Sequence, residues 1–213
     1  HFVLASVPVR QVLIERIGLS GFRVLFSIFA IITLTWVILA YKMAPYIEWW
    51  EASLELNIIP LIIMPFSCIL AVAGLTTHNV TMVGGEHLID EPNSVKGIMT
   101  VTRHPFLWAV ILLSVSHLAV TGDSASVILF GGIIVLALGG MVHIDYRRAQ
   151  LSNAAWGPIA LRTSIVPFAA AATGRTQIDW SGIGISRVGA GLALYCLLLV
   201  IHENIFGITP LMS

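Results

Sequence analysis

Apolar residues in this sequence gather in long runs, and this pattern predicts a bundle of helices that crosses a membrane. A helix that spans about 30 Å of hydrocarbon needs about 20 mainly apolar residues. The runs that meet or approach this length are residues 24 to 42, 56 to 77, 105 to 121, 125 to 144 and 185 to 207. Because no water satisfies backbone groups inside a bilayer, we expect helices rather than strands. The sequence therefore predicts an all-α polytopic transmembrane bundle that forms a single domain, residues 1 to 213.

The beginning of the chain continues the same apolar pattern. Its first residue is His1 rather than Met, and residues 2 to 5 show neither a charged region nor a signal-peptide cleavage site. We expect residues 1 to 5 to be the tail of a sixth span that begins before His1, so that the N-terminal part of that span is missing.

The basic residues are distributed unevenly between the connecting segments. Segments 6 to 23, 78 to 104 and 145 to 187 carry Arg10, Arg16, Arg23, Lys96, Arg103, Arg147, Arg148, Arg162, Arg175 and Arg187. The other segments carry no Lys or Arg, although Lys42 lies at the edge of one. The positive-inside rule then assigns the basic loops to the cytoplasmic side, and Tyr46, Trp49 and Trp50 to an aromatic belt on the far side.

The composition narrows the function classes further. Of the 213 residues 57% are hydrophobic and 10% are charged, whereas about a quarter of the residues in a soluble domain are charged. The net charge is +0, so no surface for nucleic acid is indicated. Cys68 and Cys196 both lie inside apolar runs, which favours buried packing over a disulfide or a cysteine-ligated metal.

Histidines are the main chemical signal, because ionisable residues inside a bilayer are costly and are often functional. His117 lies thirteen residues, or about 20 Å, along its span from His104, and His202 lies about 22 Å along its own span from Arg187. The two imidazoles are therefore expected at a similar depth, where they could ligate a haem iron. The alternative is that each imidazole hydrogen-bonds a neighbouring helix.

A second candidate site lies at the cytoplasmic mouth of the bundle. Arg103 and His104 precede the helix that begins at Pro105, where a helix N-terminus can bind a phosphate or carboxylate headgroup. Asp145, at the end of another span, is able to pair with Arg103 or Arg162 instead. The sequence leaves open whether these four residues form a headgroup site or an ion-pair cluster.

Several short blocks, in their order and spacing, resemble the NnrU family of bacterial membrane proteins. They are His1 to Arg10, Ala73 to Thr77, Gly97 to Trp108, Ser116 to Ala119 with Gly122 and Asp123, Ile144 to Asp145 with Arg147 and Arg148, Arg162 to Phe168, and His202 near Phe206 and Gly207. The family was first associated with denitrification clusters and is related to plant zeta-carotene isomerase. The resemblance covers nearly the whole chain and implies a bacterial inner-membrane protein.

The resemblance also implies a cofactor and a reaction. The isomerase branch is thought to hold haem b between two histidines and to catalyse a redox-gated cis-to-trans isomerisation of a polyene. Carried over by motif, the ligands are His117 and His1, whereas the depth argument favours His202 as the partner of His117. The expected partners are then the bilayer and a lipid or polyene small molecule.

Two other functions remain open from the sequence. One is an accessory or electron-transfer subunit for nitrogen-oxide metabolism, which would dock to a larger membrane complex. The other is an enzyme similar to the isoprenylcysteine methyltransferases, whose pattern also contains Arg-His-Pro, as in Arg103 to Pro105. That pattern has glycine where this chain has Ala109, and paired glutamates where it has Asp145 and Tyr146.

Overall fold

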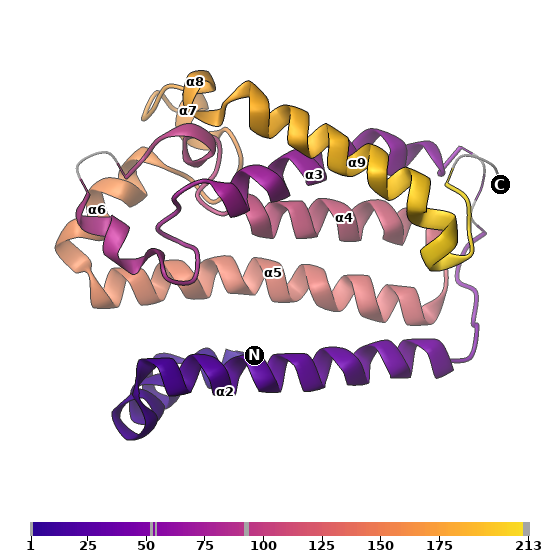
Figure 1. The fold of residues 1–213 in the computed structure, drawn as a ribbon, viewed down its shortest axis with the longest axis horizontal. Helices are drawn as coiled ribbons and strands as arrows, with labels where there is room; N and C mark the ends of the chain where they lie inside the picture. The colour runs from indigo at the N-terminus through magenta and orange to yellow at the C-terminus, as the bar shows by residue number, and fades with distance from the viewer. Residues whose placement is uncertain (1, 52, 54, 92–93, 211–213) are drawn as a thin grey trace.

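The structure, a computed structural model, describes residues 2–51, 53, 55–91 and 94–210. These residues form α-helices and short 3-10 helices, and no strand occurs among them (Figure 1). In chain order the elements are α1 (Phe2–Ala5), α2 (Val7–Met43), α3 (Ile58–Thr76), η1 (Gly85–Asp90), η2 (Gly97–Thr100), α4 (Pro105–Thr121), α5 (Ser124–Leu151), α6 (Asn153–Arg162), α7 (Ala169–Ala172), α8 (Trp180–Ile183) and α9 (Ile185–Phe206). The prediction of an all-α fold is confirmed.

The predicted membrane spans coincide with the long helices. Helices α2, α3, α5 and α9 are long and apolar enough to cross a bilayer. Helix α4 is apolar but has 17 residues, which gives it a length of about 26 Å at 1.5 Å per residue. Much of the apolar surface faces outward, as for Ile31 and Trp36 of α2, which are 64% and 70% exposed. The chain is therefore an integral membrane protein whose helices present apolar side chains to lipid.

The first connecting segment is not the loop that the sequence suggested. Residues 7 to 23 are helical and belong to α2, which is broken at Gly18 with φ 73° and ψ 167°. That backbone conformation is open to glycine and strained for other residues, so the chain turns back there. The Arg10 guanidinium then lies 5.4 Å from the centre of the Phe22 ring, across the turn. The missed signal was this single glycine inside an otherwise helical pattern.

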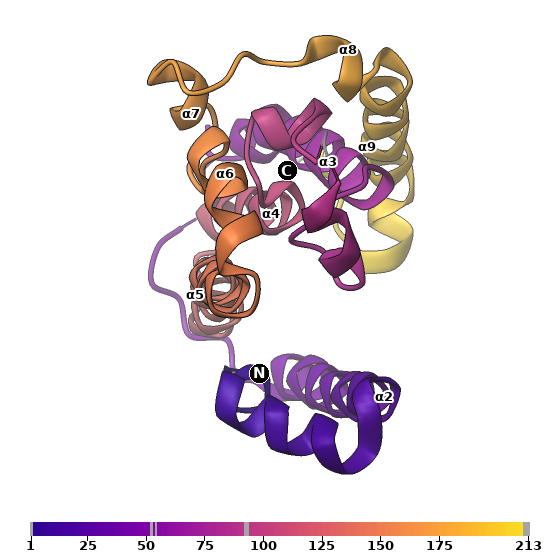
Figure 2. The same ribbon diagram turned by 90° about the vertical axis from the view of Figure 1, so that its left-hand side faces the viewer.

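Helix α3 forms the centre of the bundle, with α4 and α9 packed against it (Figures 1 and 2). Two glycines allow this close approach. A Cβ on Gly74 would lie 2.8 Å from the amide nitrogen of Phe106 in α4, and a Cβ on Gly191 of α9 would lie 2.6 Å from the Cα of Ile69. Helix α5 packs on α4, and α2 lies beyond α5 (Figure 2). Such small-residue contacts are the usual way in which membrane helices approach each other.

One end of the bundle, here called the basic end, carries residues 78 to 91, 94 to 104 and 145 to 184 and has a hydrophobic core of its own. Its buried members are Val80, Leu88, Ile89, Val95, Met99, Trp156 and Ile159. The longest polar connection of the sequence is thus folded onto α6 rather than extended into solvent. This folded loop positions the residues around Arg103.

Tryptophans hold together the opposite end, which is formed by residues 44 to 51, 53, 55, 122 to 123 and 207 to 210. The amides of Trp49 and Trp50 donate to the carbonyl of Gly122 at 2.7 and 3.2 Å. The Trp49 indole donates to Ser124 Oγ at 2.7 Å, and the Asp123 carboxylate caps α5 by accepting from the Ser126 amide at 3.0 Å. These bonds tie the loop after α2 to the α4–α5 turn.

A histidine-lined pocket and an ion-pair cluster as candidate functional sites

His117 lies on α4, four residues before its last residue, which places it about 6 Å from the opposite end. Its side chain is half-buried, and its Nδ1 donates to the carbonyl of Leu113 at 2.8 Å. The ring of Phe130 in α5 lies 5.7 Å away, measured between ring centres. The helix backbone and an aromatic neighbour thus hold this imidazole in one orientation.

His202 lies at the matching level of α9, four residues before Phe206 ends that helix. The chain turns at Gly207, with φ 72°, so that Ile208 comes back toward the helix. The Nδ1 of His202 donates to the Ile208 carbonyl at 2.8 Å, and the Phe206 ring centre lies 4.8 Å from that of the imidazole. The predicted equal depth of the two histidines is therefore met in the folded chain.

The two hydrogen bonds determine which nitrogen of each imidazole is protonated. A carbonyl oxygen only accepts, so Nδ1 must carry the proton in both neutral rings. Each Nε2 then keeps its lone pair and is available to bind a metal. Histidine ligands in metal sites show the same arrangement, with the other ring nitrogen donating to a carbonyl or carboxylate.

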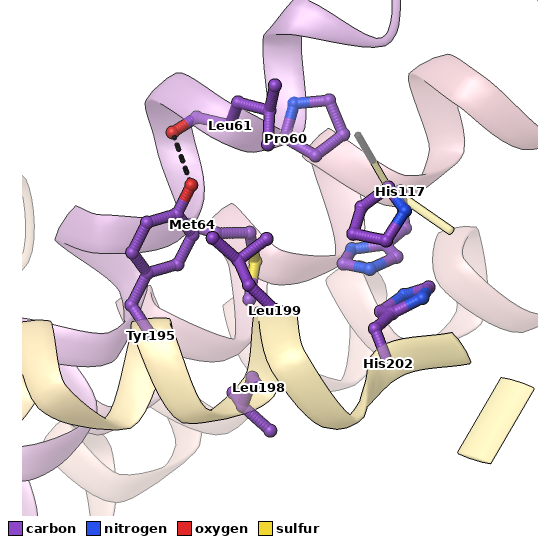
Figure 3. A pocket seen from close by; sticks show the side chains of 9 residues that line it. Pro60, Leu61, Met64, His117, Tyr195, Leu198, Leu199 and His202 are labelled. Carbon is purple, nitrogen blue, oxygen red and sulfur yellow. Dashed lines mark hydrogen bonds between the residues drawn. The ribbon is translucent and has the colours of Figure 1, made fainter. Parts of the chain in front are cut away.

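One pocket contains both imidazoles (Figure 3). Its lining residues come from α3, α4, α9 and the segment after α9: Pro60, Leu61, Met64, His117, Tyr195, Leu198, Leu199, His202 and Pro210. The pocket measures about 350 Å³ with its open side included. Figure 3 shows His117 and His202 beside each other at one end and Tyr195 at the other. Apart from these polar tips the lining is apolar.

Tyr195 is a polar residue of this pocket that the sequence reasoning missed. Its hydroxyl donates to the carbonyl of Leu61 at 3.2 Å. That carbonyl lacks its usual helical donor, because the residue four positions later is Pro65, which has no N–H. The signal was present in the sequence, since Tyr195 lies seven residues, or about two turns, before His202 on the same face of α9.

The structure forms an ion-pair cluster at the basic end. Asp145 Oδ1 lies 2.8 Å from His104 Nε2, and Asp145 Oδ2 lies 3.4 Å from Arg103 Nε. The Arg103 guanidinium also lies 5.8 Å from the centre of the Trp156 ring. Burial lowers the pKa of Arg103, the carboxylate of Asp145 raises it, and nearby Arg175 lowers it. In the described part of the chain Asp145 pairs with Arg103 and His104, whereas Arg162 is exposed at the end of α6.

The N-terminus of α4 beside this cluster is occupied by the protein itself. The His104 amide faces Thr102 Oγ1 at 3.3 Å, and the Phe106 amide is covered by Gly74. The arrangement therefore matches the ion-pair alternative, with Arg103, His104 and Asp145 as a buried unit that joins α4 to α5.

His1, the second ligand implied by the resemblance, lies outside the described residues. Its neighbour Phe2 packs against Gly139 of α5, and the His143 Nε2 donates to the carbonyl of Ala5 at 2.8 Å. Among the described residues no group of three or more His, Cys, Asp or Glu side chains is arranged to hold a metal ion. His117 and His202, which line one pocket, are the two candidate ligands that the described structure brings together.

The fold and the pocket define the class of this protein: it is an all-α membrane protein with two histidines in one apolar pocket. Comparisons with known proteins give its family. The NnrU protein family matches residues 1–210, so the chain belongs to the NnrU family. A curated relative is the chloroplastic 15-cis-zeta-carotene isomerase of Zea mays, 33% identical over 82 residues. That match covers 38% of this chain and only 22% of the maize protein. No solved structure matches the chain.

Proposed function

We propose that this protein binds haem b through His117 in the pocket between α3, α4 and α9, and isomerises a polyene lipid there. The observation that supports the proposal best is the His117 imidazole, whose Nδ1 is fixed to the Leu113 carbonyl and whose Nε2 is available. Kinship with a protein named as a carotene isomerase points to the same substrate class.

The donor chemistry of the pocket fits a haem iron. Neutral imidazole is a common haem ligand and brings no charge into the bilayer. The pocket measures about 350 Å³ with its open side included, so a haem held there would also occupy the open side of the pocket. An apolar macrocycle edge is compatible with the apolar lining and the lipid beyond it.

The residues of the chain have definite roles in this proposal. Met64, Leu198 and Leu199 provide apolar walls for an elongated hydrocarbon. The haem iron would supply a redox-controlled Lewis acid. Isomerisation rotates one carbon–carbon double bond and leaves the atoms and electrons of the polyene unchanged. The helices therefore need to supply orientation and exclusion of water, but no general acid or base.

The first experiment is a reduced-minus-oxidised absorption spectrum of the detergent-purified protein, expressed with haem supplied. A b-type spectrum that is lost or altered in His117→Ala and unchanged in His78→Ala would support the haem site. His78 is an exposed histidine, so it controls for removal of an imidazole in general. A featureless spectrum of the unaltered protein would refute haem binding.

Isomerase activity is tested separately, with 15-cis-zeta-carotene supplied to proteoliposomes and the isomers resolved by chromatography. Conversion that requires reductant and His117 is the expected result. Haem binding without conversion would favour the second candidate function, electron transfer within a membrane complex. The small size of the pocket, about 350 Å³ with its open side included, is the observation that favours this candidate.

A further inference from the structure

We propose that residues 161 to 187 form an interfacial anchor, which lies in the headgroup layer of the leaflet at the basic end and binds anionic phospholipids there. The anchor is separate from the pocket at His117 and needs neither the cofactor nor the reaction proposed above. Its position around the bundle, its outward side chains and its charges all fit such a surface.

The anchor runs around the rim of the bundle, across the direction of the long helices. Figure 1 shows α7 and α8 at the same level along the bundle axis, and Figure 2 shows the chain between them following the outer edge of the bundle. Helix α9 begins at Ile185, directly after α8. Because the long helices cross the bilayer, a segment perpendicular to them at their end lies in the plane of the membrane surface.

Buried contacts hold the anchor against the bundle. Ala170 of α7 is 0% exposed and Ile183 of α8 is 6% exposed. The Asp179 carboxylate accepts from the backbone amides of Gly97 and Gly182, each at 2.8 Å. The inner face of the anchor is therefore fixed, and its outer face is a defined surface rather than a free loop.

The outer face of the anchor is apolar and exposed. The exposed fraction is 52% for Phe168, 70% for Trp180 and 91% for Ile185. Leu161 and Val166 are exposed as well. Exposed apolar surface of this kind marks a contact with a partner or a membrane, and tryptophan is enriched where a bilayer meets water. This face thus favours the headgroup layer over water.

The backbone at Phe168 is strained. Its φ of 63° is the only positive φ of a residue other than glycine in the described part of the chain, and a bulky residue adopts it only where the surrounding structure holds it there. The Phe168 amide donates to the Val101 carbonyl at 2.8 Å, and Ser164 Oγ accepts from the Ala170 amide at 3.1 Å. The fold thus bears strain at an exposed aromatic position, and contact of the ring with lipid accounts for an aromatic residue there.

Basic residues flank the apolar face. Residues 161 to 187 contain Arg162, Arg175 and Arg187 but one acidic residue, Asp179. No carboxylate of the described residues forms an ion pair with any of these three arginines. Anionic headgroups would supply the missing negative charges, and one arginine near an anionic surface contributes about fivefold to affinity.

The position of the anchor is tested by fluorescence quenching in lipid nanodiscs. Subtraction of the Trp180→Phe signal from that of the unaltered protein isolates Trp180, and Phe168→Trp added to Trp180→Phe reports the other end of the anchor. We expect lipids brominated high on the acyl chain to quench both reporters, and acrylamide, a water-soluble quencher, to quench them weakly. Strong quenching of both reporters by acrylamide, with none by brominated lipid, would overturn the proposal.

The preference for anionic lipid is tested with the reporter at position 168. Brominated phosphatidylglycerol is compared with brominated phosphatidylcholine at equal mole fraction. We expect phosphatidylglycerol to be enriched about fivefold beside the reporter. Arg162→Gln should reduce this enrichment, whereas Arg162→Lys, the matched control that keeps the charge, should retain it. Equal quenching by the two lipids in the absence of any change at Arg162 would refute binding of anionic lipid.

Should Trp180→Phe fail to yield monodisperse protein, the unaltered protein decides. A phospholipid that carries a photoreactive diazirine near its headgroup should label residues 161 to 168 and 180 to 184, as mapped by mass spectrometry. Labelling confined to α2, α3, α5 and α9 would contradict the proposal.

Discussion

Removal of the Asp145 carboxylate should destabilise the protein strongly, because the buried cluster at the basic end depends on it. The side chains of Arg103 and Asp145 are only 11% and 17% exposed. Asp145→Ala leaves the Arg103 charge in a buried position and removes the partner of His104 Nε2. Loss of one partner from a buried ion pair costs about 3 to 5 kcal/mol. We take the lower value, about 3 kcal/mol, because the pair lies at the end of the bundle.

A loss of about 3 kcal/mol corresponds to a fall in Tm of about 6 to 12 °C for a chain of this size. The assay heats detergent-solubilised protein and measures the fraction that remains monodisperse in size-exclusion chromatography. Asp145→Asn, which keeps an acceptor for His104 but loses the charge, should fall between Asp145→Ala and the unaltered protein. Asp90→Ala removes an exposed carboxylate from the same end and should change Tm by less than 2 °C. If Asp145→Ala also lies within 2 °C of the unaltered protein, the cluster contributes nothing to stability.

Three further predictions follow from the packing and the hydrogen bonds. Gly191→Ala should lower stability by about 1 to 3 kcal/mol, because the added Cβ would lie 2.6 Å from the α3 backbone. The loss is measured as a fall in Tm. Gly189→Ala is the control, because a Cβ there meets no atom within 4 Å. Tyr195→Phe should cost about 1 kcal/mol, because the Leu61 carbonyl loses its donor. Asp179→Asn should lower Tm at pH 7, and the difference from the unaltered protein should begin to shrink as the pH falls below about 4.

The pH dependence predicted for Asp179 follows from its hydrogen bonds. The backbone amides of Gly97 and Gly182 donate to its carboxylate, each at 2.8 Å, and lower its pKa in the folded protein. A lowered pKa stabilises the fold above the pKa of the unfolded chain, and this contribution is lost as the pH falls through the folded pKa. A difference in Tm between the two proteins that stays constant from pH 7 to pH 3 would contradict this explanation.

The comparisons and the structure confirm the coarse part of the functional prediction. NnrU membership and the membrane bundle are established, whereas haem binding and polyene isomerisation are proposals that await the experiments above. The second haem ligand, the assignment of the basic loops to the cytoplasmic side of a bacterial inner membrane, and docking to a larger membrane complex also stay predictions.

The helices of this fold could be predicted from the amino-acid sequence. A bilayer allows few backbone conformations, so a long apolar run is almost always a helix. The predicted spans 105 to 121 and 185 to 207 agree with α4 and α9 within one residue. The sequence prediction was wrong around Gly18. Residues 7 to 23 are helical rather than a loop, and the turn at Gly18 that breaks this helix leaves no mark in the apolar pattern. The sequence also predicted the equal depth of His117 and His202, because a helix converts residue number into distance along its axis.

Which side chains meet depends on how the helices pack against one another. Periodicity gives no information on the rotation of one membrane helix against another, since apolar residues surround each helix and lipid accepts any of its faces. The contacts of Gly74 and Gly191 with α4 and α3 set that rotation. This packing places His202 in the His117 pocket, pairs Asp145 with Arg103 and leaves Arg162 outside the cluster. The sequence thus determined how deep each histidine lies, and helix packing determined which two share a site.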